Sequence, residues 1–143
     1  NIVPEYNDPD PVLSLQAGLD FTVTSLKVNN IILLGHINCG GCNTCLNPPE
    51  NFDKMPYLKG WIGKLNPVKE SIEDQLAELD DPVAKSDLME KTNIITQYNH
   101  LMEYPIIADR VAAGNLKVEG WHFHTDEGFV EVYQPETKTF KRL

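Results

Sequence analysis

The feature that most constrains this fold is a short apolar run that ends in glycine and histidine. Ile31 to Leu34 are branched apolar residues, and Gly35 and His36 follow them. A continuous apolar run of this length is typical of a β-strand that is buried on both faces in a parallel sheet. We therefore expect a buried strand here. His36 would lie at its carboxyl end, where open α/β sheets bind their ligands.

A cysteine follows this strand at a spacing that suits metal binding. Cys39 comes three residues after His36, and Gly40 and Gly41 allow the backbone to turn away closely. An imidazole and a thiolate at this spacing can hold one zinc ion. On these residues alone, a buried strand that ends by chance near a histidine and a cysteine is an equally good interpretation.

Two further cysteines, Cys42 and Cys45, leave the local chemistry open. The three thiols form a tight, odd-numbered cluster, which argues against a disulfide framework and favours a reducing compartment such as the cytoplasm. With His36 they could close a four-ligand structural zinc site, or Cys42 and Cys45 could form a C-x-x-C redox pair. We favour a third interpretation, in which these two cysteines pack as small apolar side chains beyond the glycine turn.

Length and charge limit the class of protein. A chain of 143 residues suits a single domain over 1–143 with a sizeable core. Twelve basic and 21 acidic residues give a net charge of −9, which argues against nucleic acid and anionic membranes as partners. No apolar run approaches the roughly 18–20 residues of a membrane span, and no signal peptide is visible.

A helix is expected before the strand. Asp10 can cap it and Pro11 suits its first position. Apolar residues then recur at spacings of three and four, at Val12, Leu15, Leu19, Val23 and Leu26. Phe21 lies off this stripe, so we expect it to face a partner or a cleft.

More helices are expected after the cysteines. A loop over 43–56 should lead into helical segments over 61–79, with a break at Pro67. Asp87-Leu88-Met89-Glu90 resembles a capping box and predicts that a helix begins there. The next helical stretch begins or kinks at Pro105 and is stopped by a glycine.

The end of the chain predicts a β-hairpin, with strands over 116–123 and 129–133. His122 and His124 alternate on one face, where they could chelate a metal. We expect them instead on the exposed side of an edge hairpin. The predicted fold class is therefore α/β, with a mainly parallel central sheet flanked by helices and a C-terminal antiparallel hairpin.

Two other polar features carry weaker signals. His100 falls within a helix near the apolar stripe, so we expect a packed or surface residue rather than a ligand. Asp109-Arg110 is expected to be a pair on a helix surface.

The segment from Leu33 to Cys42 resembles the second zinc motif of the β-class carbonic anhydrases, a buried strand followed by Gly-His-x-x-Cys-Gly-Gly. The resemblance covers nearly the whole chain. Asn1-Ile2 resembles the end of the family's Arg-Asn-x-Ala-Asn turn, and Leu19 to Val28 resembles its Leu-Glu-Tyr-Ala-Val helix and the exit from it. Trp61-Ile62 and Leu116 to Trp121 resemble the family's tryptophan-bearing helix and closing strands.

This resemblance implies a zinc enzyme that reversibly hydrates carbon dioxide to bicarbonate through a zinc-bound hydroxide. It implies that His36 and Cys39 are zinc ligands. Phe21 stands where the family often has a tyrosine beside the cleft, and Gly40 and Gly41 are further candidates for lining it. The family also implies a homodimer or a larger homo-oligomer.

The chain departs from the family pattern in one respect. The family's first motif, Cys-x-Asp-x-Arg, supplies a third zinc ligand and an Asp–Arg pair, and this sequence lacks it, so the catalytic residues are unknown. Asp109-Arg110 has the wrong spacing to replace that pair. Because the chain begins without Met and no strand precedes its first helix, we expect further residues upstream. Alternative functions are an incomplete or non-catalytic carbonic-anhydrase-like subunit, or a hydrolase of carbon disulfide or carbonyl sulfide.

Overall fold

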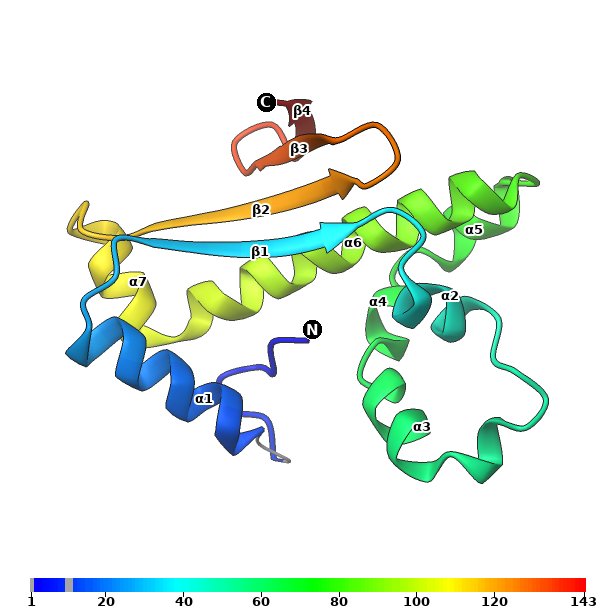
Figure 1. The fold of residues 1–143 in the computed structure, drawn as a ribbon, viewed down its shortest axis with the longest axis horizontal. Helices are drawn as coiled ribbons and strands as arrows, with labels where there is room; N and C mark the ends of the chain where they lie inside the picture. Colours follow the sequence, from blue (N-terminus) through cyan, green and yellow to red (C-terminus); the bar gives the residue numbers. More distant parts are fainter. Residues whose placement is uncertain (1, 10–11) are drawn as a thin grey trace.

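The computed structural model describes residues 2–9 and 12–143, which form a sheet with helices against one face and around its carboxyl end (Figure 1). The strands lie in the order β1 (Asn30–His36), β2 (Lys117–His124), β3 (Phe129–Gln134) and β4 (Thr139–Arg142). β1 and β2 are parallel, whereas β2, β3 and β4 are antiparallel to their neighbours. The α/β class and the terminal hairpin are confirmed.

The hairpin continues into β4, a strand that the sequence did not predict. β4 pairs with β3 from Glu131 opposite Arg142 to Gln134 opposite Thr139. Of its four residues only Phe140 is apolar, so the sequence has no alternation of apolar and polar residues that would predict a strand. Within the described residues, the parallel part of the sheet is therefore the single pair β1 and β2.

Helices connect and cover these strands. They are α1 (Leu13–Asp20), the π-helix η1 (Phe21–Ser25), α2 (Gly40–Leu46), the 3-10 helix η2 (Phe52–Lys54), α3 (Pro56–Gly63), α4 (Asn66–Glu70), α5 (Glu73–Glu78), α6 (Pro82–Glu103) and α7 (Pro105–Ala112). The predicted helix starts near Pro67 and at Pro105 are confirmed. After α7, Gly114 adopts a left-handed φ of 71°, which ends the helix.

Three predicted boundaries were wrong. The expected loop over 43–56 begins inside α2, since the helix starts directly at Gly40. α6 begins at Pro82 rather than near Asp87, because Asp81 caps it by accepting a hydrogen bond from the Val83 backbone N–H at 3.1 Å. The apolar stripe of the first helix also ends early: the wider π turn of η1 changes the helical register, and Leu26 is 59% exposed. The predicted start at Asp10 and Pro11 lies outside the described residues.

α6 lies against one face of the sheet and contacts two apolar clusters. The first contains Met89 of α6 and packs α2 to α5; its buried members are Ile2, Cys42, Cys45, Ile62, Leu65, Val68, Ile72, Leu76 and Met89. The second contains Leu101 of α6 and packs η1, α7 and β2; its buried members are Val3, Val23, Leu101, Tyr104, Ile107, Leu116 and Val118.

The N-terminal segment is fixed along α6. The Val3 backbone N–H donates to Gln97 Oε1 at 2.6 Å, and His100 Nδ1 donates to the Val3 carbonyl at 2.7 Å. Tyr104 Oη donates to the Pro4 carbonyl at 3.0 Å. His100 is therefore a packed residue, as predicted.

Two glycines let α6 approach the sheet closely. A Cβ atom at Gly35 of β1 would lie 2.6 Å from Ile94 Cδ1, and one at Gly120 of β2 would lie 2.7 Å from Ile94 Cγ2. Real Cβ atoms do not tolerate such distances, so the two strands have room for Ile94 only because these positions lack side chains.

The prediction that β1 is buried on both faces was wrong for the described residues. Its exposure alternates along the strand, and Ile32 and Leu34 are 46% and 62% exposed. They line a shallow hollow of about 450 Å³ with Trp121, Phe123 and Val130. The reason is that α6 packs on the opposite face, while the described part of the chain leaves this face without a covering helix (Figure 1).

Candidate metal centre

His36 is the last residue of β1, as predicted, and its ring is already oriented. Nδ1 lies 2.8 Å from the Ile37 carbonyl oxygen. Because a carbonyl oxygen only accepts, Nδ1 carries the proton, and the lone pair is left on Nε2. Metal-binding histidines are commonly held in this way by a second hydrogen bond.

Cys39 follows at the start of α2, after a turn in which Asn38 has a φ of 55°. Its backbone N–H donates to Glu90 Oε1 at 2.8 Å. A hydrogen bond from the Cys42 thiol, assisted by the backbone N–H groups of Cys42 and Gly41 and by His36, outweighs burial and lowers the pKa of Cys39 to about 5. Cys39 is therefore a thiolate at neutral pH, which is the form that binds metals.

Cys42 and Cys45 lie in the first apolar cluster, and all three cysteines are free. The hydrogen bond that Cys42 donates to Cys39, together with burial, raises the pKa of the Cys42 thiol. Burial also raises the pKa of Cys45. Both stay protonated at neutral pH, which fits the packing role expected for them, and Cys42 additionally stabilises the Cys39 thiolate.

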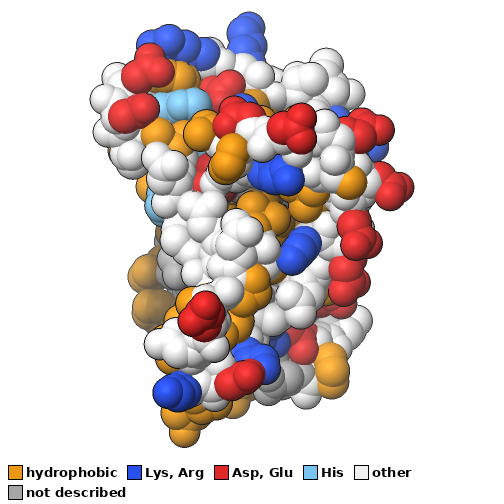
Figure 2. All heavy atoms as spheres, turned by 90° about the vertical axis from the view of Figure 1, so that its right-hand side faces the viewer, with side chains coloured by type: hydrophobic (Ala, Val, Ile, Leu, Met, Phe, Trp, Pro, Cys, Tyr) orange, Lys and Arg blue, Asp and Glu red, His pale blue; other side chains and the backbone are white. Residues whose placement is uncertain are grey.

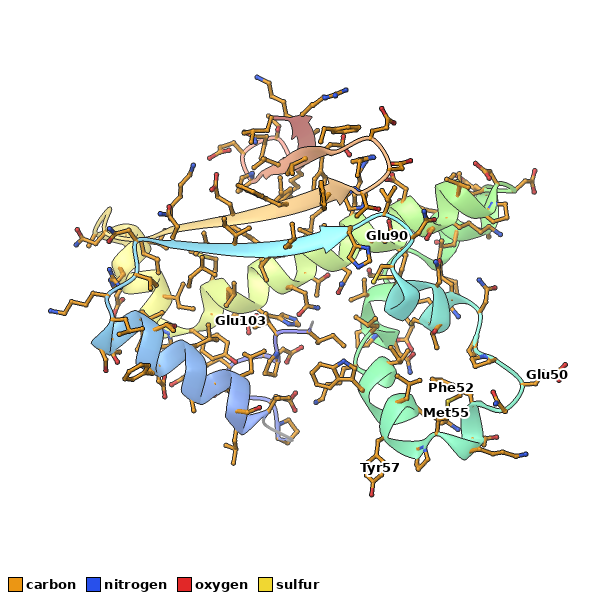
Figure 3. All side chains as sticks on the ribbon, in the orientation of Figure 1. Glu50, Phe52, Met55, Tyr57, Glu90 and Glu103 are labelled. Atoms are coloured by element: carbon orange, nitrogen blue, oxygen red, sulfur yellow. The ribbon has the colours of Figure 1, made fainter. Side chains whose placement is uncertain are left out.

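Glu90 is a site residue that the sequence interpretation missed. It lies in α6 beside the carboxyl end of β1 (Figure 3) and is 3% exposed. Besides the Cys39 backbone, it accepts hydrogen bonds from Ser86 Oγ at 3.1 Å and from His122 Nε2 at 3.1 Å. The capping-box interpretation placed it in the first turn of a helix and gave it no role at the site. Its position four residues before Ile94, on the buried side of the helix, was the signal that it is internal.

The cleft candidates fall in two places. Gly40 and Gly41 form the first turn of α2, and a Cβ atom at Gly41 would lie 3.8 Å from Cys39 Sγ. Phe21 is 57% exposed in η1, which precedes the amino end of β1 (Figure 1). Within this chain the structure therefore does not bring Phe21 to His36, which lies at the other end of the strand.

Arg110 does not form the expected surface pair with Asp109. Its Nη1 donates to the Val23 carbonyl at 2.8 Å, and its Nη2 donates to the Asn115 carbonyl at 3.0 Å. The guanidinium therefore ties η1 to the end of α7, because unpaired carbonyls at helix ends attract its donors.

The expectation that His122 and His124 decorate an exposed face was also wrong. His122 is fully buried, since this face of β2 packs against α6. With Glu131 of β3, the two histidines form the one cluster of three potential metal ligands among the described residues, with ligand atoms within 4.8 Å of one another. His36 and Cys39 thus supply two donors at their own site, and the described residues add no third there.

Comparisons with known proteins show the family to which the chain belongs. Residues 1–130 match the sequence model of the family described as "Carbonic anhydrase". The chain is 29% identical to the carbonic anhydrase of Helicobacter pylori strain J99, over the whole chain and 66% of that protein. It is 30% identical to the carbonic anhydrase of Saccharomyces cerevisiae, over 88% of the chain and 58% of that protein. The chain thus spans less than two thirds of these relatives.

Solved structures show the same likeness. The β-carbonic anhydrase CcaA superposes with a TM-score of 0.88 at 25% identity, over 99% of this chain and 68% of that one. One of two tetrameric β-carbonic anhydrases from Sordaria macrospora superposes with a TM-score of 0.72 at 23% identity, which supports the fold alone. No helix in the described part of the chain has the length and apolar character needed to cross a bilayer.

Proposed function

Because this chain belongs to the β-class carbonic anhydrase family, we propose that the complete protein catalyses the reversible hydration of carbon dioxide to bicarbonate. The observation that carries the proposal is the Cys39 thiolate beside an oriented His36 at the carboxyl end of β1. The names of the relatives favour this reaction over the alternatives of a non-catalytic subunit or a carbon disulfide hydrolase.

His36 and Cys39 have the donor chemistry that zinc prefers. When bound, zinc lowers the pKa of a water molecule to about 7 and so supplies hydroxide, the nucleophile for carbon dioxide, at neutral pH. In this proposal Cys39 binds through its thiolate and His36 through Nε2. Cys42 stabilises the thiolate, and Glu90 fixes the Cys39 backbone. A third donor comes from outside these 143 residues, in keeping with the greater length of the relatives.

We further propose a homodimer or larger homo-oligomer, located in a reducing compartment such as the cytoplasm. The hollow lined by Ile32, Leu34 and Trp121 leaves an apolar sheet face that association would cover. Three free thiols fit a reducing compartment.

The test replaces each ligand in the complete protein. His36→Ala and Cys39→Ser should each remove one equivalent of zinc, measured by mass spectrometry, and nearly all carbon dioxide hydration, measured by stopped flow. Cys45→Ser and His100→Ala are the matched controls and should keep both. The double variant Cys42→Ser/Cys45→Ser should also retain zinc. An unchanged zinc content in both ligand variants would contradict the assignment.

A second measurement concerns the 143-residue chain alone. With two donors at the site, it should hydrate carbon dioxide far more slowly than the complete protein, because an incomplete ligand set neither binds zinc tightly nor fixes an open position. Equal activity in the two samples would mean that the third ligand lies within this chain.

A further inference from the structure

We propose that His122, His124 and Glu131 form a second site for a divalent transition metal ion, best suited to zinc, on the α6-facing side of the β2–β3 hairpin. This site goes beyond the proposed catalytic centre, because it uses none of that centre's ligands.

The sheet register brings the three side chains together. His122 pairs directly with Glu131 across the antiparallel strands, and His124 lies two residues further along the same face. His124 Nε2 is 2.9 Å from Glu131 Oε2, and His122 Nδ1 is 3.7 Å from the same oxygen. Ligands of a tetrahedral zinc ion with bonds of about 2.0–2.2 Å lie about 3.3 Å apart. These two distances lie on either side of this value, and all three ligand atoms lie within 4.8 Å of one another, so the cluster would contract through side-chain movements to hold the ion.

The buried nitrogen of His122 is the strongest indication of a missing ligand. Nδ1 is fully buried and has no hydrogen-bond partner. The other nitrogen, Nε2, contacts the buried Glu90 carboxylate at 3.1 Å and can donate its proton there. A carboxylate on the far nitrogen of an imidazole is the usual second contact of a metal-binding histidine. The near nitrogen is thereby left with a lone pair directed toward the cluster.

A proton on Nδ1 is the competing occupant. Its nearest carboxylate oxygens would be Glu131 Oε2 at 3.7 Å and Asp87 Oδ1 at 3.9 Å. Both distances are too long for a hydrogen bond, so a proton would leave Nδ1 unsatisfied. A metal ion between Nδ1 and the carboxylate would satisfy both groups.

The other two ligands are held in position and can be reached by an ion. The His124 ring stacks on Phe129, with centroids 4.0 Å apart and an interplanar angle of 13°. Although burial opposes ionisation, hydrogen bonds from His124 and Lys91 lower the pKa of Glu131 to about 2. A metal ion that binds both His124 Nε2 and this carboxylate displaces the proton between them, which moves to Nδ1 so that the imidazole binds as its other tautomer. The His124 and Glu131 side chains are 19% and 20% exposed. Figure 2 shows histidine beside acidic side chains at the top of the face where β1 and β2 end.

Lys91 is the resident cation with which a metal must compete. Its Nζ lies 3.0 Å from Glu131 Oε2 and 3.1 Å from Asp87 Oδ1. An ammonium group this close repels a divalent ion. Lys91→Met should therefore increase zinc affinity by about tenfold or more. It would also free the Asp87 carboxylate as a fourth donor.

The experiment counts metal in the complete protein after equilibration with zinc alone and gel filtration. We expect two equivalents, falling to one in His124→Ala and in Glu131→Gln, with His100→Ala unchanged. With cobalt in place of zinc, these two variants should keep the intense thiolate-to-cobalt absorption of the Cys39 site and lose the weaker absorption of the two-histidine site. Isothermal titration should show the gain in affinity for Lys91→Met.

The deciding variants are partly exposed, so they test the site even if the buried His122→Ala protein does not fold. Near-ultraviolet circular dichroism checks that each variant is folded. The proposal is overturned if His124→Ala and Glu131→Gln bind as much zinc as the unaltered protein. The proposal is also overturned if the unaltered protein binds only one equivalent of zinc and Cys39→Ser binds none.

Discussion

The turn after β1 and the hairpin after β2 lie at the carboxyl ends of adjacent parallel strands, yet different forces hold them. In the turn, Cys39 is fixed by neutral donors, and Cys42 behind it is embedded in an apolar cluster. In the hairpin, His124 and Glu131 belong to a partly exposed network of charges. Glu90 contacts both regions. One buried carboxylate thus supports both a region held by packing and a region held by charge, and the two regions should respond differently to pH.

The largest loss of stability should come from Glu90→Ala, because Glu90 contacts both regions. Its loss leaves the Cys39 backbone N–H and His122 Nε2 without their acceptor in a buried place, whereas Ser86 Oγ keeps Asn43 Oδ1 at 2.7 Å. We expect a loss of about 3–5 kcal/mol in the free energy of unfolding, measured by urea denaturation. Glu103→Ala, an exposed glutamate of the same helix, should change it by less than about 0.5 kcal/mol. Similar losses of unfolding free energy in both variants would show that Glu90 does not support the two regions.

A smaller effect, confined to the hairpin, is expected for Glu131→Gln. The folded-state pKa of Glu131 is about 2, below the ordinary glutamate value of 4.5, so the carboxylate stabilises the fold above pH 4.5 and loses that contribution as the pH falls toward 2. In metal-free protein the variant should be less stable by up to about 3 kcal/mol at pH 7. This difference should shrink steadily between pH 4.5 and 2. Glu127→Gln in the exposed turn is the control, and a pH-independent difference for Glu131→Gln would contradict the charge network.

The smallest effect should be confined to the turn. Cys42→Ala removes the hydrogen bond that does most to hold the pKa of Cys39 at about 5. A hydrogen bond to a charged group contributes about 1.5–3 kcal/mol, which would raise the pKa by about 1–2 units, so alkylation of Cys39 in metal-free protein at pH 6 should slow by about two- to fifteenfold. Cys45→Ser should leave the rate unchanged. Iodoacetamide labelling followed by peptide mass spectrometry gives the rate, and equal rates in the two variants would show that Cys42 is not the donor.

The parts of the fold that were predictable have local causes. β1, the position of His36 at its end and the helix starts near Pro67 and at Pro105 depend on neighbouring residues in the chain. Glu90 and His122 could not be placed in this way. Their burial depends on contacts across 51 and 32 residues of sequence, and on which face of β2 packs against α6. The apolar run of β1 predicted burial on both faces, but the described residues cover only one of them.

Gly35 and Gly120 allow α6 to pack closely against the sheet, because neither residue places a side chain between them. A Cβ atom added at either position would lie within 3 Å of the Ile94 side chain. Ile94 lies one helical turn after Glu90. A methyl group at either position would lift this part of the helix and withdraw the Glu90 carboxylate from Cys39 and His122 together. In a mutational scan, Gly35→Ala and Gly120→Ala would therefore resemble the loss of Glu90, although neither glycine has a side chain of its own.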